Sequence, residues 1–387
     1  MTGTAAVESS EALAARVRDA RVRREPLRIV GAGEWLDAGR PCAVTQTLDV
    51  RPLRGVTEFA PDDFTISVRA GTSLAEIDEI AASADRWLTL RPFGSAAGTI
   101  GATVATASWG PLASAFGTPR DHVLGCEVVT GRGDVIRVGG RVVKNVAGFD
   151  LVRLMTGAWG TFGVITEVTL RLRARPEVDR TFAVAIDGAG AEVCDVVRRW
   201  LRASAFTPLA AELCSPALAS RLGAGTGTVL LVRLAGNEPL VRAAALSVAE
   251  LGGTRELDPG IWDALRVAEP AGAATYRLGA APASLGAVWV RAVRDVEGGG
   301  GWAHATVARG VVRCVLPRAA DASDEEIARL RGSIAHVPAA GSRIVERAPA
   351  PLWAELPSAT SDALSTGVRR AFDPDGILNP GILGSPA

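Results

Sequence analysis

The chain has 387 residues, a length at which one hydrophobic core usually gives way to two domains. Its 42 basic residues equal its 42 acidic residues, and it has no run of basic residues that would favour nucleic-acid binding. The N-terminus lacks the pattern of a signal peptide, and no apolar run is long enough to span a bilayer. We therefore expect a cytoplasmic protein without a membrane span.

The five cysteines are scattered along the chain and form no C-x-x-C pair, which predicts neither a disulfide framework nor a zinc or iron–sulfur site. We expect no bound metal. If the chain accepts electrons, it must then pass them to oxygen, to a diffusible molecule or to another subunit.

Up to Pro176 the chain alternates between short strands and helices. Residues 64–70 alternate between apolar and polar side chains, as a half-buried strand does. Ser73 and Glu76 then form a capping-box pattern that predicts a helix. The other elements expected here are a helix over 9–24 and strands over 27–30, 123–130, 135–138 and 164–172.

Beyond Pro176 the strands and helices mix without a regular βαβ alternation, which favours an α+β layer. The expected strands cover 182–186, 209–213, 229–234, 287–293, 311–316 and 343–345, and the expected helices cover 191–203, 239–251 and 324–334. Gly298–Gly301 is expected to form a hairpin loop, with a mobile lid as the alternative. The predicted domains are 1–176, 177–366 and a C-terminal tail of 367–387.

Three glycine-rich loops lie in the N-terminal half. Gly31-Ala32-Gly33 follows a strand but fails the G-x-G-x-x-G pattern, because Leu36 stands where the third glycine is needed. A nicotinamide-binding Rossmann domain is therefore disfavoured. The loop alone is equally consistent with an ordinary turn.

The second loop, residues 92–111, is dominated by glycine, alanine, threonine and serine. Glycine lets the backbone approach a ligand closely, and successive backbone N–H groups bind phosphate without any net positive charge. The structural alternative is a helix of small residues packed on a sheet. That alternative accounts for the alanines but not for the clustered glycines and hydroxyl side chains.

The third loop runs from Lys144-Asn145 to Gly160-Thr161-Phe-Gly163-Val164-Ile165, directly before an alternating strand. Its glycines suggest backbone that lies against a flat ligand. A lysine near such a ligand would stabilise negative charge, although most lysines simply lie on the surface.

Four stretches of the chain resemble the PCMH-type FAD-binding domain of the vanillyl-alcohol oxidase superfamily. They are Val68–Gly71, Gly98–Gly110, Arg120–Asp150 and Gly160–Ile165, and the tail Phe372–Gly381 also fits. Within that superfamily the sequence is most similar to FAD-binding subunits of bacterial glycolate oxidase. The resemblance implies an α+β protein: a two-subdomain flavin domain followed by a cap, or substrate, domain built from an antiparallel sheet and helices.

The resemblance also implies how FAD is held. Gly31–Trp35 and Gly98–Ala102 would bind the diphosphate, and the remaining residues would flank the ring, ribose or adenine. No histidine or cysteine occupies 31–35 or 95–108, so the FAD is expected to be non-covalent. The full set of expected cofactor residues is Gly31, Ala32, Gly33, Glu34, Trp35, Pro92, Gly98, Thr99, Ile100, Gly101, Ala102, Ala105, Thr106, Ser108, Gly110, Lys144, Asn145, Gly160, Thr161, Gly163, Val164, Ile165 and Asn379.

No catalytic residue stands out. His122 and His336 are expected to be structural, whereas His304 is a weak candidate for a base. Arg291, Arg313 and Arg343 fall on expected strands, and any of them could hold a carboxylate or simply be solvated.

Three functions fit these observations. The first is oxidation of a small 2-hydroxy acid, glycolate to glyoxylate above all, by hydride transfer to flavin N5 with electrons passed to a partner subunit. The resemblance implies a second flavin subunit and an iron–sulfur subunit as partners. The second is a non-catalytic flavin-binding subunit of such a complex, and the third is a stand-alone alcohol or sugar oxidase that uses oxygen.

Overall fold

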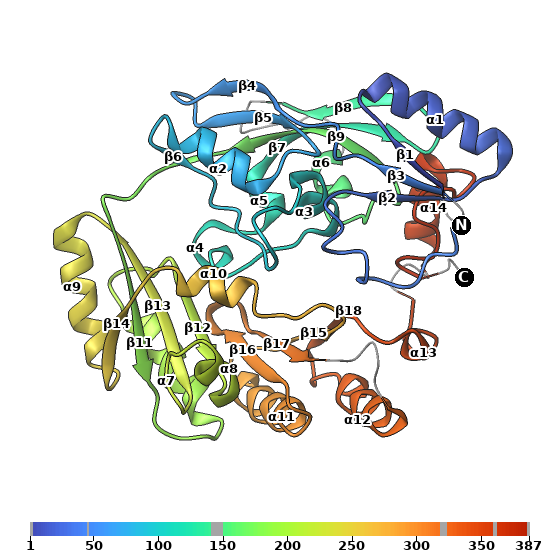
Figure 1. Cartoon of the computed structure of the whole chain (residues 1–387). Helices are drawn as coiled ribbons and strands as arrows, with labels where there is room; N and C mark the ends of the chain where they lie inside the picture. The colour runs from blue at the N-terminus through green and yellow to red at the C-terminus, as the bar shows by residue number, and fades with distance from the viewer. Residues whose placement is uncertain (1–2, 45, 141–149, 318–322, 359–361, 385–387) are drawn as a thin grey trace. The chain divides into compact units, whose positions relative to one another are not determined.

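The computed structural model describes residues 3–44, 46–140, 150–317, 323–358 and 362–384 (Figure 1). The chain forms two compact units. Unit 1 consists of Met1–Gly110, Gly117–Arg175 and Leu356–Ala387, and unit 2 consists of Pro111–Phe116 and Pro176–Glu355. The division expected from the sequence differs from these units over residues 111–116, at Pro176 and over residues 356–366.

A small parallel sheet begins unit 1. Its strands β1 (Gly3–Ala6), β3 (Gln46–Asp49) and β2 (Leu27–Val30) pair in that order, and helix α1 (Ser10–Arg23) packs its apolar residues into the same core. Ser9 caps α1 by accepting the Ala12 N–H, so the helix begins one residue later than the expected range of 9–24. The C-terminal tail also reaches this core, because the Asn379 N–H donates to the Leu27 carbonyl.

A five-stranded antiparallel sheet forms the rest of unit 1. In the order β4-β5-β9-β7-β8 its strands are Val56–Ala60, Thr65–Arg69, Gly163–Arg171, Val123–Thr130 and Val135–Gly139. Helices α2 (Leu74–Ala82) and α3 (Ile100–Thr106) contribute Leu74, Ile77, Ile100 and Val104 to its core. The expected capping box is present at the start of α2, and the expected hairpin is β7 with β8.

Glu127 on β7 links α1 to the five-stranded sheet. Its carboxylate accepts hydrogen bonds from Ser10 Oγ, from Thr166 Oγ1 at 2.8 Å and from Arg137 Nε at 2.8 Å. Burial raises the pKa of Glu127, but the hydrogen bonds from Ser10, Arg137 and Thr166 outweigh burial and hold the pKa below its ordinary value. The side chain therefore stays ionised while it ties the helix to the sheet.

Unit 2 is built on an eight-stranded antiparallel sheet in the order β14-β11-β13-β12-β16-β17-β15-β18. In that order the strands cover Thr254–Leu257, Val178–Ala185, Val229–Gly236, Ala210–Cys214, Trp302–Thr306, Val311–Leu316, Ala274–Gly279 and Ser342–Arg347. Helices α9 (Glu238–Ala249) and α11 (Leu285–Glu297) pack on strands of the sheet, and α7 (Glu192–Ala203) and α12 (Asp324–Ala335) pack against α11 (Figure 1). The α+β prediction is confirmed.

The expected strand over 287–293 was wrong, because this segment lies within helix α11. The valines and the tryptophan of this segment favour a strand, but the residues that the helix buries recur three or four positions apart: Leu285, Val288, Trp289, Ala292 and Val296. Arg291 consequently lies on a helix. Gly298–Gly301 then joins α11 to β16, so this segment is a helix-to-strand connection and not a hairpin loop.

The remaining elements are short. They are β6 (Arg86–Trp87), α4 (Ala113–Phe116), α5 (Pro119–His122), α6 (Leu151–Met155), β10 (Arg173–Ala174), α8 (Pro216–Arg221), α10 (Ile261–Arg266), a 3-10 turn (Val307–Arg309), α13 (Ala350–Trp353) and α14 (Ala363–Phe372). In the part of the chain that the structure describes, no helix has the length and apolarity needed to cross a membrane.

The stability of unit 1 is expected to depend on the protonation of His122, which is 2% exposed at the end of α5. Burial, followed by the charges of Arg173 and Arg171, lowers the pKa of His122 to about 4 from its ordinary 6.5. Between these two values the unfolded chain binds a proton that the folded chain does not, so stability falls as the pH falls. From pH 7.5 to pH 5 the loss attributable to His122 is about 2 kcal/mol.

Urea unfolding of the wild type and of His122→Gln at both pH values measures this loss. The variant should show a shallower fall in the free energy of unfolding than the wild type between these two pH values. Parallel pH profiles for the wild type and His122→Gln would rule out the assigned role.

Candidate functional site

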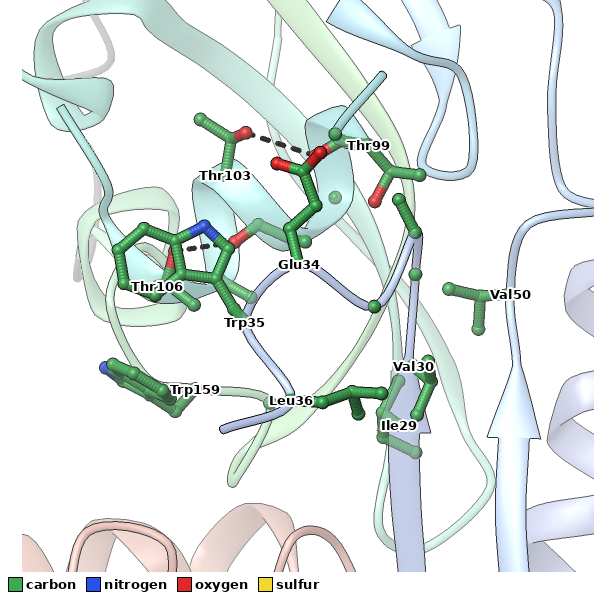
Figure 2. A pocket seen from close by; sticks show the side chains of 18 of the residues that line it. Ile29, Val30, Glu34, Trp35, Leu36, Val50, Thr99, Thr103, Thr106 and Trp159 are labelled. Atoms are coloured by element: carbon green, nitrogen blue, oxygen red, sulfur yellow. Dashed lines mark hydrogen bonds between the residues drawn. The ribbon is translucent and has the colours of Figure 1, made fainter. Parts of the chain in front are cut away.

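A pocket with an empty volume of about 900 Å³, part of it open to solvent, lies within unit 1. Three segments of backbone and the C-terminal tail line it. The segments are the loop after β2, the turn that precedes α3 together with α3 itself, and the turn that leads into β9. Figure 2 shows the pocket from close by.

The loop after β2 packs directly on helix α3. A Cβ atom at Gly31 would overlap Thr99 Oγ1 and would lie 3.5 Å from the Cβ of Ala102. Gly33 has a φ of +89°, a conformation that side chains rarely adopt. The two glycines therefore let this loop lie against the start of α3 and form one wall of the pocket.

The turn before α3 contributes Ser95, Gly98 and Thr99 to the pocket lining. Gly94 has a φ of +102°, and the Ser95 N–H that follows it donates to Glu34 Oε2 at 2.9 Å. Thr99 precedes α3 without a side-chain capping bond, and its buried Oγ1 has no hydrogen-bond partner in the part of the chain described by the structure. A buried hydroxyl group without a partner is costly, so this atom suits a polar ligand.

Thr103 and Thr106 lie one turn apart on α3. Their hydroxyl groups donate to helix carbonyls, Thr103 Oγ1 to the Thr99 oxygen at 3.1 Å and Thr106 Oγ1 to the Ala102 oxygen at 2.8 Å (Figure 2). Only the lone pairs of these two hydroxyl oxygens remain for a ligand. They can accept hydrogen bonds but do not add donors to the pocket.

Asn379 of the tail joins two walls of the pocket. Its Oδ1 accepts the Ile29 N–H at 2.9 Å, and its Nδ2 donates to the Trp159 carbonyl at 2.8 Å. Gly160 follows with a φ of +69°. Because both ends of the amide are used within the protein, the Asn379 side chain positions the loops around it.

The pocket has chemically different regions. In Figure 2, Glu34, Thr99 and Thr103 gather beside α3, whereas Ile29, Val30, Leu36 and Val50 form an apolar wall near β2, and the indoles of Trp35 and Trp159 lie at a third side. Backbone amides and hydroxyl groups next to apolar and aromatic surface suit a ligand with a phosphate part and a planar part.

Two predicted binding glycines also pack the fold together. A Cβ at Gly101 would lie 2.7 Å from the Cβ of Ala70, and one at Gly163 would lie 2.9 Å from the Val129 carbonyl oxygen. Bulky substitutions here would displace α3 or β9 whether or not a ligand binds. They would therefore not isolate a binding contact.

Comparisons with known proteins give the family. The sequence-family model described as "FAD binding domain" matches residues 2–139 of this chain. The chain is 35% identical to the glycolate oxidase subunit GlcE of Escherichia coli (strain K12) over 261 residues, which is 66% of this chain and 68% of that protein. This chain belongs to the GlcE family. It is thus a member of an FAD-dependent oxidoreductase family, and the predicted cofactor, FAD, is confirmed.

Other relatives of this GlcE family member agree with the assignment. It is 32% identical to the glycolate oxidase subunit GlcD of Bacillus subtilis (strain 168) over 178 residues, 45% of this chain but only 38% of that protein. Among solved structures, p-cresol methylhydroxylase superposes with a TM-score of 0.72 at 18% identity, over 99% of this chain and 88% of that one. At such identity the likeness concerns the fold alone, and it confirms the predicted PCMH-type fold.

Most of the residues expected to bind the cofactor come together in the one pocket. From the loop after β2, from α3 and its preceding turn, and from the turn into β9, it gathers Gly31, Ala32, Gly33, Glu34, Trp35, Pro92, Gly98, Thr99, Gly101, Ala102, Ala105, Thr106, Gly160, Gly163, Val164 and Ile165, and from the tail Asn379. Cofactor contact by each of them stays a prediction.

Four expected residues lie outside the pocket lining. Ile100 is buried in the core, and Thr161 Oγ1 donates to the Ala158 carbonyl at 2.7 Å. The Ser108 N–H is bonded to the Thr103 carbonyl, and a Cβ at Gly110 would overlap the Arg91 carbonyl oxygen. Lys144 and Asn145 fall outside the described residues.

Sequence reasoning missed several lining residues: Arg28, Ile29, Val30, Leu36, Val50, Leu74, Phe93, Ser95, Thr103, Trp159 and Ile382. Most of them are apolar, and Ile29, Val30 and Leu74 belong to strand β2 or helix α2, where they look like ordinary core residues. The run of small residues over 92–111 did contain a signal for Ser95 and Thr103.

His304, the weak candidate base, lies on β16 of unit 2 and is 3% exposed. Its Nδ1 lies 2.9 Å from Glu212 Oε2, and Thr306 Oγ1 donates to the other oxygen of Glu212 at 2.7 Å. The residue does not line the pocket described above. A histidine held by a buried carboxylate is typical of a structural polar network as well as of a catalytic pair.

Two of the candidate arginines are engaged within unit 2. Arg313 is buried between two carboxylates, bonding Glu269 and lying 2.6 Å from Glu346 Oε2. Arg343 donates to the Ile334 carbonyl oxygen. Arg313 thus offsets buried acidic groups, as buried charges generally do.

Loss of the Asn379 amide should weaken both unit 1 and its pocket. Asn379→Ala leaves the Ile29 N–H and the Trp159 carbonyl without their partner, which should lower the free energy of unfolding by about 2 kcal/mol and FAD affinity about tenfold. Urea unfolding and titration of the apoprotein with FAD, followed by flavin fluorescence, measure the two effects.

Asn237→Ala provides the matched control. Asn237 caps α9 in unit 2 by accepting the Leu240 N–H, and loss of this cap should cost about 1 kcal/mol of stability. FAD affinity should stay at the wild-type value. If Asn379→Ala binds FAD as tightly as this control does, Asn379 does not hold the pocket in shape.

Proposed function

We propose that the pocket of unit 1 is the FAD site. The observation that carries this proposal is the convergence of three glycine-rich backbone segments and Asn379 on one cavity. The residues fit the cofactor: the unpartnered Thr99 hydroxyl and the Ser95 amide suit its diphosphate, and the Trp35 and Trp159 indoles suit a planar ring system. Loop 31–35 and residues 98–102 would hold the diphosphate, without covalent attachment.

The proposed reaction is the oxidation of a small 2-hydroxy acid, glycolate to glyoxylate, as one subunit of a larger enzyme. Family membership supports this proposal, since the relatives are named as glycolate oxidase subunits. When bound, FAD supplies the two-electron acceptor for such an oxidation. This chain's own part is to bind and orient the cofactor, while a second flavin subunit and an iron–sulfur subunit carry the electrons onward.

A second candidate function is a flavin-binding subunit that leaves the oxidation to its partner. The observation that favours it is the placement of His304, the candidate base, which is buried and held by Glu212. In the described part of unit 2, Arg313 is likewise occupied by Glu269 and Glu346. His304 Nδ1 and the Arg313 guanidinium are thus both engaged by carboxylates of the protein itself.

Anaerobic addition of glycolate to the purified, FAD-loaded chain separates the two functions. Bleaching of the flavin absorbance by glycolate, with D-lactate as a second 2-hydroxy acid, is expected if the chain oxidises the substrate itself. Sodium dithionite should bleach the same sample in every case and shows that the flavin is reducible. Retained colour with both acids would leave oxidation to a partner, and a chain that takes up no FAD would contradict the proposed site.

Lys144 gives a test of the third predicted loop, because it is the only lysine in the sequence. If it lies near the cofactor, FAD should slow its reaction with an amine-acetylating reagent at least about tenfold, because a buried or ion-paired amine reacts poorly. Peptide mass spectrometry measures the rate, and the N-terminal amine of the same chain is the internal control. Equal labelling with and without FAD would remove Lys144 from the cofactor site.

A further inference from the structure

Glu34 places a carboxylate in the part of the pocket expected to take the diphosphate. Its Oε2 accepts the Ser95 N–H at 2.9 Å. A Cβ at Gly94 would lie 2.9 Å from this oxygen, and one at Gly98 would lie 3.4 Å from it. Both glycines thus leave room for the carboxylate, which points toward the start of α3 in Figure 2.

The charge of this carboxylate matters because the pocket contains few charged groups. Among the described residues that line it, Glu34 is the only acid and Arg28 the only arginine. The Arg28 guanidinium is itself directed to Cys42 Sγ at 3.3 Å and to the Leu36 carbonyl at 3.4 Å. The Ser95 N–H, which donates to the Glu34 carboxylate, is therefore a group that an incoming anion would compete for.

We propose that Glu34 is an internal anion that competes with the diphosphate of the cofactor for the Ser95 amide and must leave this amide when the cofactor binds. The inference rests on the proposed FAD site. Binding then replaces the Glu34 carboxylate at this amide with the diphosphate of the ligand. The carboxylate therefore lowers cofactor affinity. It also favours ligands whose diphosphate binds the amide more tightly than the carboxylate does. Glu34 is in this sense a specificity-determining residue of the pocket.

Glu34→Gln tests the proposal because it keeps the size and the acceptor oxygen of the side chain but removes its charge. Charge-assisted hydrogen bonds are roughly twice as strong as neutral ones, and the repulsion of the diphosphate also disappears. The dissociation constant of FAD from the apoprotein, measured by flavin fluorescence, should fall about tenfold in this variant. Asp37→Asn is the matched control: it removes one acidic charge from the same loop, at an exposed position outside the pocket lining, and should leave the affinity unchanged.

Inorganic pyrophosphate provides a readout that does not depend on the flavin. Millimolar pyrophosphate should raise the melting temperature of apo Glu34→Gln more than that of the wild type or of Asp37→Asn, because the amide at Ser95 no longer holds a carboxylate. If Glu34→Gln is poorly folded by circular dichroism, Glu34→Ala replaces it in both measurements.

The outcomes separate the inference from the proposed function. Weaker FAD binding by Glu34→Gln would make Glu34 a direct ligand and would overturn the inference, as would an unchanged affinity. If none of the variants binds FAD, the proposed cofactor site fails, and the pyrophosphate measurement still decides the role of Glu34. In that case, equal stabilisation of the wild type and Glu34→Gln by pyrophosphate would overturn the inference about Glu34.

Discussion

The shape of the pocket depends on the side-chain amide of Asn379. One amide group bridges the Ile29 N–H of β2 and the Trp159 carbonyl, which belong to segments 130 residues apart in the sequence. The backbone around it is rich in glycine, which loses more conformational freedom on folding than any other residue. Such loops need fixed neighbours. The tail supplies them because its own backbone pairs with Leu27 and its apolar residues Ile377 and Leu378 lie in the core of the small sheet.

Sequence patterns predicted the elements whose determinants are local. The strand over 123–130 and the capping box at Ser73 appear in the structure where expected. The pattern over 287–293 misled, because its apolar residues favour a strand locally while burial on one helix face decides the outcome. In the site, glycine and hydroxyl clusters indicated the loops, but Ile29 and Val50 resemble core residues of strands, and nothing local marks them as pocket lining. Asn379 was found only through the family resemblance, since its partners are remote in sequence.

Glycines that look alike in the sequence have two physical roles here. At Gly33, Gly94 and Gly160 a positive φ fixes the path of a loop. At Gly101 and Gly163 the missing side chain lets helix α3 and strand β9 approach their neighbours. Only structure separates these roles, since both produce the same residue. Glu34, whose side chain can be altered without changing the φ of any of these glycines, therefore reports on binding more directly than the glycines do.

The two units compensate charge inside the protein in different ways. In unit 2 the buried charge of Arg313 is offset by whole carboxylates, those of Glu269 and Glu346. The pocket of unit 1 has no comparable set of cations among its described lining residues, so an anionic ligand there must be held mainly by backbone dipoles and hydroxyl groups. Dipoles offset charge only at short range and in fixed orientation. The binding of an anion at such a site is therefore sensitive to a single misplaced charge. For this reason the position of Glu34 beside the Ser95 amide affects anion binding more than the net charge of the chain does.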